Sequence, residues 1–132
     1  MILLDTHAAF WLNNAPEKLS RDATRAIRKA ASSTGIALSS ISLWELAILV
    51  VAGRLRLRKV TARGFLEALV QTPGMAVLDI TPEVAVGASE LPHDFPRDPA
   101  DRIIAATARV HNLPLVTKDQ GLLESPLLRT IW

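Results

Sequence analysis

Short apolar runs alternate with longer amphipathic stretches along this chain, and this alternation limits its possible folds more than any other feature. Apolar runs this short are typical of strands that are buried on both faces. The predicted strands are Ile2–Leu4, Ile36–Leu38, Met75–Leu78, Leu115–Val116 and Thr130–Ile131. Strands that alternate with helices predict an α/β fold, in which right-handed crossovers build a parallel sheet covered by helices on both faces.

The stretches between these runs carry helical periodicity and the residues that begin or end helices. In Ser20–Ala31 the apolar residues recur at helical spacing, with Arg and Lys on the other face. Proline stands at the first position of two further helices, where its missing N–H has no cost. The other predicted helices are Ala8–Asn13, Ser42–Ala52, Thr61–Gln71, Thr81–Glu90 and Pro99–His111. The length of 132 residues suits a single domain over residues 1–132.

The composition argues against several classes of protein. There is no cysteine, which excludes disulfides, a thiolate nucleophile and a cysteine metal site. The longest apolar run, Leu46–Ala52, is far too short to span a membrane. The first residues lack the length and the basic flank of a signal peptide, and there is no glycine-rich phosphate loop. We therefore expect a cytoplasmic protein with no membrane association and no nucleoside triphosphate chemistry.

Four acidic residues stand just beyond the predicted strands, either at once or within the first turns of the helix that follows. They are Asp5, Glu45, Asp101 and Asp119. In an open parallel sheet, ligands bind in a crevice beyond the carboxyl ends of the strands. We therefore expect all four carboxylates to point into one crevice.

Helix capping is an alternative explanation for each acid taken alone. Ser42 and Glu45 have the spacing of a capping box, and Asp98 stands before Pro99 as a helix cap would. Capping does not, however, require acids to converge on one edge of a sheet. Converging carboxylates repel one another by ~1–4 kcal/mol per pair, depending on screening, unless a cation offsets their charge. Carboxylates without His or Cys suit Mg²⁺ or Mn²⁺, which promote phosphodiester cleavage.

Four blocks of this sequence resemble the signature blocks of the PIN-domain ribonucleases, and more narrowly those of VapC-type toxins from bacterial type II toxin–antitoxin systems. The blocks are MILLDTH at 1–7, SSISLWE at 39–45, RDPADRIIAATA at 97–108 and LVTKD at 115–119. They occur in the same order and at the same spacing over nearly the whole chain. The resemblance implies a three-layer α/β/α sandwich with a central parallel sheet, and cleavage of RNA with Mg²⁺ or Mn²⁺ as cofactor. It also implies two partners, a cognate antitoxin protein and a second copy of the chain.

The resemblance also assigns roles to individual acids. Asp5, Glu45 and Asp101 match the three most regular family acids, which hold the metal and carry catalysis. Asp119 matches a fourth, more variable position, where the acid holds the metal through water. Asp98 matches an outer acid of the site, although we favour its role as a helix cap.

Supporting roles are implied for three further residues. Thr6 matches a hydroxyl that hydrogen-bonds within the site, and Ser42 is expected to do likewise. Arg102 follows a site acid directly, so it is placed either to contact phosphate or to pair with an acid, and we favour the pair. The histidines share no metal-binding spacing, although His7 is close enough to Asp5 to touch a substrate.

The Lys and Arg residues suggest where a polyanion would bind. The chain has 15 Lys and Arg against 13 Asp and Glu, so the surface is basic once the four site acids are set aside. Arg54, Arg56, Arg58 and Lys59 alternate with apolar residues and could follow an RNA backbone, but a solvated loop explains them equally well. Trp11 and Trp44 lie on apolar helical faces, which favours core or dimer contacts over base stacking.

Two other functions share part of this pattern. A flavodoxin-like phosphoacceptor domain also gathers acids at strand ends, and Asp79 with Lys118 fits it loosely, but Asp5 has no acidic neighbour and Glu45 stays unexplained. The other alternative is a catalytically silent PIN-like binding module. Intact carboxylates at all four positions argue against that second alternative.

Overall fold

The computed structural model describes residues 1–132, and its centre is a five-stranded parallel sheet. Its strands are β1 (Ile2–Leu4), β2 (Ile36–Ser39), β3 (Met75–Leu78), β4 (Leu115–Val116) and β5 (Thr130–Ile131). Their order across the sheet is β3-β2-β1-β4-β5, and every neighbouring pair is parallel. All five predicted strands are therefore confirmed, and β2 is one residue longer than predicted.

Seven α-helices and one 3₁₀ turn connect these strands. They are α1 (Thr6–Asn14), η1 (Pro16–Lys18), α2 (Arg21–Ala31), α3 (Ser40–Val51), α4 (Ala62–Val70), α5 (Pro82–Ser89), α6 (Pro99–Val110) and α7 (Gln120–Leu123). The six predicted helices are present with small shifts at their ends. The sequence did not predict η1 and α7, because elements of three and four residues are too short to show a period.

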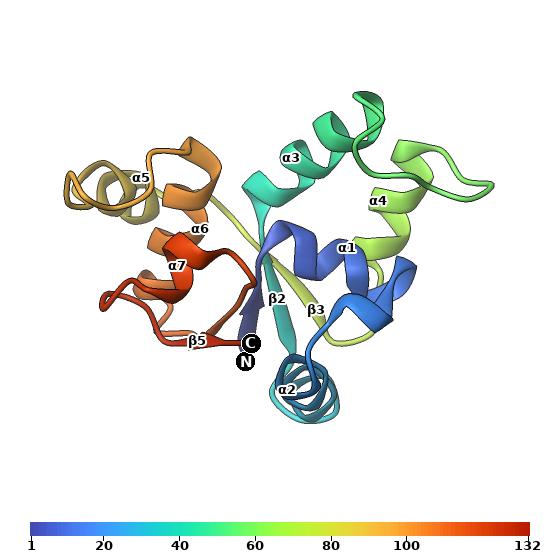
Figure 1. Cartoon of the computed structure of the whole chain (residues 1–132), viewed down its shortest axis with the longest axis horizontal. Coiled ribbons are helices and arrows are strands. Elements are labelled where there is room, and N and C mark those ends of the chain that lie inside the picture. Colours follow the sequence, from blue (N-terminus) through green and yellow to red (C-terminus); the bar gives the residue numbers. More distant parts are fainter.

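Each face of the sheet carries its own hydrophobic core, which gives the predicted three layers. Along β1, Ile2 and Leu4 face the larger cluster, which includes side chains from α1 to α4, whereas Leu3 faces a cluster with α6 and α7. Figure 1 shows α5, α6 and α7 to one side of the strands and α1, α3 and α4 to the other. Because both faces are covered, the strands have no polar alternation.

The strand order creates a switch point beside β1. The chain passes from β1 to β2 and β3 on one side of it, and β4 and β5 lie on the other. In such sheets the crevice opens where the order reverses, beyond the carboxyl ends of the strands. The fold therefore places the residues after β1 and β4, which include Asp5 and Asp119, at the same point.

A second region lies on the α1 side of the sheet, and we call it the arm. It consists of the second half of α3, the connection 52–61 and α4, and it stands apart from α5 to α7 in Figure 1. One face of its first helix is exposed and apolar, with Trp44, Ile48 and Val51 exposed by 61%, 45% and 81%. No helix of the structure is long and apolar enough to cross a membrane.

Candidate active site

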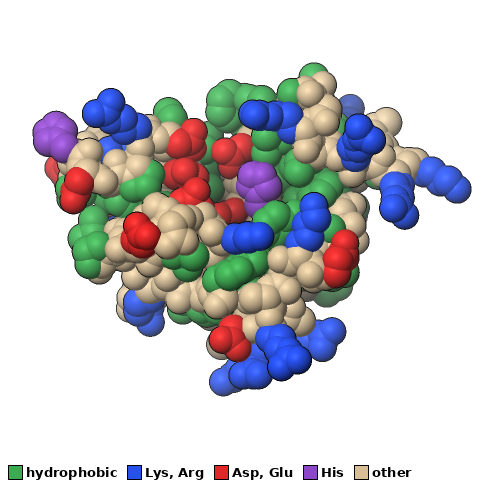
Figure 2. All heavy atoms as spheres, viewed as in Figure 1, with side chains coloured by type: hydrophobic (Ala, Val, Ile, Leu, Met, Phe, Trp, Pro, Cys, Tyr) green, Lys and Arg blue, Asp and Glu red, His purple; other side chains and the backbone are tan.

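One open cleft of about 520 Å³ brings the predicted acids together at the switch point. Figure 2 shows acidic side chains gathered in a hollow, with basic side chains around it. The cleft is lined by Asp5, His7, Trp11, Glu45, Asp98, Asp101, Lys118 and Asp119. All four acids predicted from the sequence are in this set, and Asp98 joins them.

Asp5 is fixed by hydrogen bonds from two distant parts of the chain. Its Oδ1 accepts from the backbone N–H of His7 at 2.8 Å, so it caps α1. Its Oδ2 accepts from the hydroxyl of Thr117, which follows β4, at 2.5 Å. Burial raises the pKa of this carboxyl, while the hydrogen bond from Thr117 opposes the rise. The carboxylate is therefore held in one orientation at the floor of the cleft.

Glu45 reaches the cleft from the second turn of α3. This helix begins at Ser40 with Ser39 at its N-cap, so the capping box expected from Ser42 and Glu45 is wrong. The Ser42 hydroxyl instead accepts from the Thr6 hydroxyl at 3.0 Å in a buried contact that ties α1 to α3. Burial raises the pKa of Glu45, and the charges of Asp98 and Asp5 add to the rise. Glu45 is thus free of a capping role.

Asp101 gives the clearest physical sign that the acids converge. Its pKa is raised to about 7, with burial as the largest cause and the charges of Asp98, Asp119, Asp5 and Glu45 adding to the rise. A carboxyl with four like charges around it releases its proton reluctantly. Asp98 caps α6 by accepting from the backbone N–H of Asp101 at 3.0 Å, as we favoured, and it also belongs to this group of charges.

Asp119 is the most exposed of the predicted acids and caps α7. Its Oδ1 accepts from the backbone N–H of Leu122, and its own N–H donates to the Thr117 hydroxyl, both at 3.0 Å. Thr117 therefore links Asp5 to Asp119 through one hydroxyl. We did not predict a role for Thr117, although it stands in the same LVTKD block as Asp119.

Arg102 does not pair with a site acid, and this expectation is wrong. Its guanidinium donates to the backbone carbonyls of Leu91, Pro92 and Phe95 at 3.3–3.4 Å. Successive helical residues point about 100° apart, so the residue after Asp101 turns away from the cleft. Arg102 instead fixes the segment that leads to α6.

The basic run lies in the arm, away from the residues that line the cleft. Arg54, Arg56, Arg58 and Lys59 are exposed in the connection between α3 and α4. The alternating leucines of this run pack against the larger core cluster, which explains the alternation. Contact between these basic residues and RNA stays a prediction.

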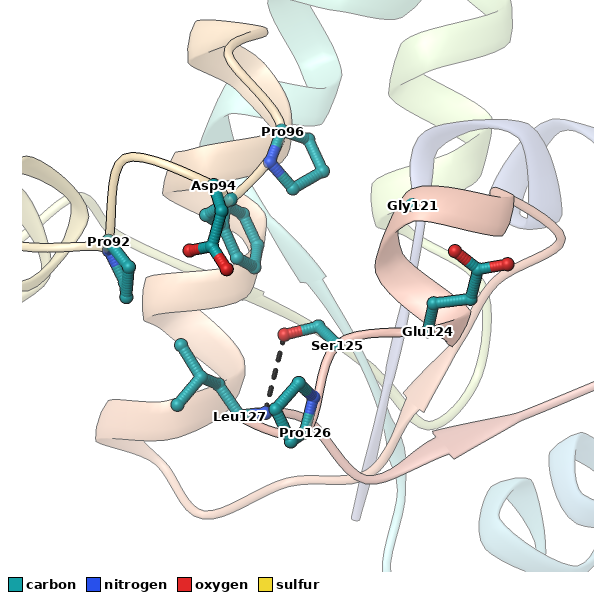
Figure 3. A pocket seen from close by; sticks show the side chains of 9 residues that line it. Pro92, Asp94, Pro96, Gly121, Glu124, Ser125, Pro126 and Leu127 are labelled. Carbon is teal, nitrogen blue, oxygen red and sulfur yellow. Dashed lines mark hydrogen bonds between the residues drawn. The ribbon is translucent and has the colours of Figure 1, made fainter.

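A second pocket, of about 410 Å³, lies beside α7 and the segment before α6 (Figure 3). Its two acids, Asp94 and Glu124, lie apart on different segments, and the rings of Pro92, Pro96 and Pro126 stand at the edges of the pocket. None of the predicted site residues lines it. Asp79, the residue that a phosphoacceptor domain would need, follows the edge strand β3 and is also outside the acidic cleft. The site chemistry therefore belongs to the acidic cleft.

The donor atoms of the cleft match a hard cation. They are carboxylate oxygens, and Mg²⁺ is commonly held by one or two carboxylates together with several waters. As the side chains stand, no group of three or more Asp, Glu or His is arranged to hold a metal ion by itself. A cation held partly through water fits both the donor type and the mutual repulsion at Asp101.

Comparisons with known proteins agree with this fold. Residues 2–125 match the PIN domain. The chain is 40% identical over 133 residues to Ribonuclease VapC22 of Mycobacterium tuberculosis, covering 99% of this chain and 98% of that protein. VapBC2 from Rickettsia felis, bound to a promoter DNA fragment, is a similar solved structure, with 21% identity and a TM-score of 0.73 over 98% of this chain and 97% of that one. A toxin-antitoxin complex from Klebsiella pneumoniae has 22% identity and a TM-score of 0.66 over 97% of this chain and 95% of that one. The chain therefore belongs to the PIN-domain family, and within it to the VapC proteins.

Proposed function

We propose that this chain is an endoribonuclease toxin that uses Mg²⁺ or Mn²⁺. The observation that carries the proposal is the set of five carboxylates around one cleft, where burial and the charges of the other four raise the pKa of Asp101. Such a concentration of like charge destabilises a fold unless a bound cation offsets the repulsion. The ribonuclease similar over nearly the full length of the chain supports RNA as the substrate.

Each acid contributes in a way that follows from its position. Asp5, Glu45 and Asp101 would hold the cation, since they are partly or fully buried and line the same cleft. Asp119 is exposed at the rim and would act through water. Asp98 adds negative charge to the same cleft while it caps α6.

The reaction is hydrolysis of a phosphodiester. A water oxygen bonds to phosphorus and releases a proton, the bond from phosphorus to the leaving ribose oxygen breaks, and that oxygen takes up a proton. When bound, the cation supplies Lewis acidity for this exchange. The protein keeps the acids in place: Thr117 and the His7 N–H orient Asp5, and the Thr6–Ser42 hydrogen bond holds α1 against α3.

We also propose that a cognate antitoxin inhibits the enzyme, as the toxin-antitoxin complex from Klebsiella pneumoniae suggests. The exposed apolar face of α3, which includes Ile48 and Val51, offers a surface for an apolar segment of that partner. The nearby acidic cleft would accept a basic side chain from the same partner. Both contacts would keep RNA away from the acids.

The test compares RNA cleavage by the purified wild-type protein, by Asp5→Asn and by Asp79→Asn. We expect cleavage with Mg²⁺ or Mn²⁺, loss of cleavage with a chelator, and loss in Asp5→Asn. Asp79→Asn is the matched control, because Asp79 is exposed and lies outside the cleft. Sequencing of the RNA ends would identify the cleavage site.

Two results would remove the assignment. Persistent cleavage by Asp5→Asn would show that a contaminant or another site is responsible. Calorimetry that finds no binding of Mg²⁺ or Mn²⁺ to the wild-type protein would favour the silent binding module instead.

A further inference from the structure

The acidic cleft has one apolar wall, and that wall is a tryptophan. Trp11 is the single hydrophobic residue among the eight that line the cleft. It lies one helical turn after His7 on α1, so both side chains stand on the face of the helix nearest the acids. A large aromatic surface is therefore presented within the same space as the five carboxylates.

The indole is held in position by its neighbours. Part of it packs against the larger core cluster. The centre of its ring lies 5.7 Å from that of His7 and 5.9 Å from that of Trp132, both in tilted arrangements. These contacts come from both ends of the chain and limit the motion of the ring. A ligand that stacks on the ring would pay little to order it.

Two lysines stand beside the same ring. The Nζ atoms of Lys118 and Lys18 lie 5.9 Å and 6.0 Å from its centre, near the outer limit of a cation–π contact. Both side chains are exposed, so each ammonium can turn from the ring to an arriving phosphate. The rim of the cleft thus combines an aromatic surface with two positive charges.

The environment of Trp11 differs from that of an ordinary core residue. The phenyl rings of Phe10 and Phe65 are 5% and 7% exposed and pack edge to face inside the core. Trp11 is only half-buried and opens onto the cleft. Our expectation of a core or dimer contact therefore describes only one side of its ring.

We propose that Trp11 is a base-stacking platform for single-stranded RNA, with Lys118 and Lys18 binding the phosphates beside the stacked base. The proposal rests on the proposed function, because the same cleft holds the catalytic acids. Stacking on an aromatic side chain recognises any base and prefers none by hydrogen bonding. It orients the nucleotide so that its phosphate faces the acids, while the lysines offset the repulsion between phosphate and carboxylates.

The test measures equilibrium binding to three short oligoribonucleotides of equal length: oligoadenylate, oligouridylate and an abasic ribose-phosphate chain. An Asp5→Asn background with Mg²⁺ present prevents cleavage during the measurement. On this protein we expect oligoadenylate to bind tightest, oligouridylate less tightly and the abasic chain least. That order needs no further substitution, so it stays informative even if a variant fails to fold.

Substitutions at the platform separate stacking from charge. Trp11→Leu should lower affinity for the two base-bearing oligomers about 5-fold or more and leave the abasic chain unchanged. Trp11→Phe should restore most of the lost affinity, since it keeps an aromatic face. Lys118→Gln should weaken the binding of all three oligomers alike and reduce the salt dependence of that binding. Lys29→Gln, on the surface of α2, is the control and should change neither.

Two outcomes would overturn the proposal. One is equal loss for all three oligomers in Trp11→Leu, which would indicate a structural role. The other is equal affinity of the starting protein for base-bearing and abasic chains. Failure of the proposed function would appear separately, as absence of metal-dependent cleavage by the wild-type protein.

Discussion

The floor of the acidic cleft and the arm differ in which side chains they bury and which they expose. The floor buries polar side chains, including Asp5, Thr6, Ser42 and Thr117, and no buried side-chain nitrogen or oxygen atom in the protein lacks a hydrogen-bond partner. The arm exposes apolar side chains along α3. Buried polar groups and exposed apolar groups are both unfavourable for an isolated fold. The contrast supports both proposals, catalysis at the floor and partner binding at the arm.

The largest expected effect is the loss of RNA cleavage when an acid of the cleft is replaced. Asp101→Asn removes one charge from the centre of the carboxylate group, so we expect RNA cleavage to fall by about 100-fold or more, beyond what loss of a supporting residue causes. Single-turnover cleavage at saturating Mg²⁺ measures this. Cleavage within about threefold of wild type would place the catalytic acids elsewhere.

The next largest effect is a loss of stability when the core beneath the floor is truncated. Leu38 on β2 is fully buried in the larger cluster, and Leu38→Ala should lower the free energy of unfolding by about 2–5 kcal/mol. Urea titration followed by circular dichroism measures this loss. A loss below about 1 kcal/mol would show that the core beneath the floor is loosely packed.

The floor also predicts how stability depends on pH without divalent cations. The pKa of Asp101 is raised from 3.8 to about 7, and those of Asp5 and Glu45 are raised too, so the native state binds more protons than the unfolded chain in this range. Stability is therefore highest below about pH 4 with respect to these groups, and it falls as the pH rises towards 7.

Thermal unfolding in a chelator at several pH values tests this dependence. Asp101→Asn should flatten the profile and raise the melting temperature above pH 7, and Mg²⁺ should stabilise the wild-type protein there. A wild-type profile that rises steadily from pH 4 to pH 8 would contradict the charge repulsion described for the cleft.

The smallest effect on stability is expected in the arm. Ile48→Ser and Val51→Ser change exposed side chains, so each should alter the free energy of unfolding by no more than about 0.5 kcal/mol. The same changes should weaken antitoxin binding about fivefold or more, because exposed apolar side chains gain most when a partner covers them. Calorimetry with the purified antitoxin measures the affinity. Unchanged binding would show that the interface does not include this face of α3.

The sequence predicted the strands and the convergence of the acids because both depend on local pattern. Uninterrupted apolar runs require cover on two faces, and acids after parallel strands meet at one edge. Sequence pattern did not predict Thr117 as the partner of Asp5, since their hydrogen bond joins residues 112 positions apart. It also misplaced Arg102, whose direction depends on the helical phase after Asp101 and on a loop without periodicity.

The position of Trp11 illustrates the same limit. Periodicity assigned the residue to an apolar helical face, and part of the ring does pack on the core. Lys18 is close in sequence, in η1, but Lys118 and most acids of the cleft come from α3, from the start of α6 and from the segment after β4, so no window around residue 11 contains them. Homodimer formation, which the family resemblance implied, stays a prediction.

The strand order also sets when the cleft of a newly made chain can be completed. β4 pairs with β1, yet it is translated long after it, and both Thr117 and Asp119 follow β4. At the usual speed of protein synthesis, about 5–20 residues per second, these residues appear about 6–23 s after Asp5. Until then the first carboxylate lacks its hydroxyl partner and the rim of the cleft is missing. On the proposed function, the chain would therefore be inactive for most of its own synthesis.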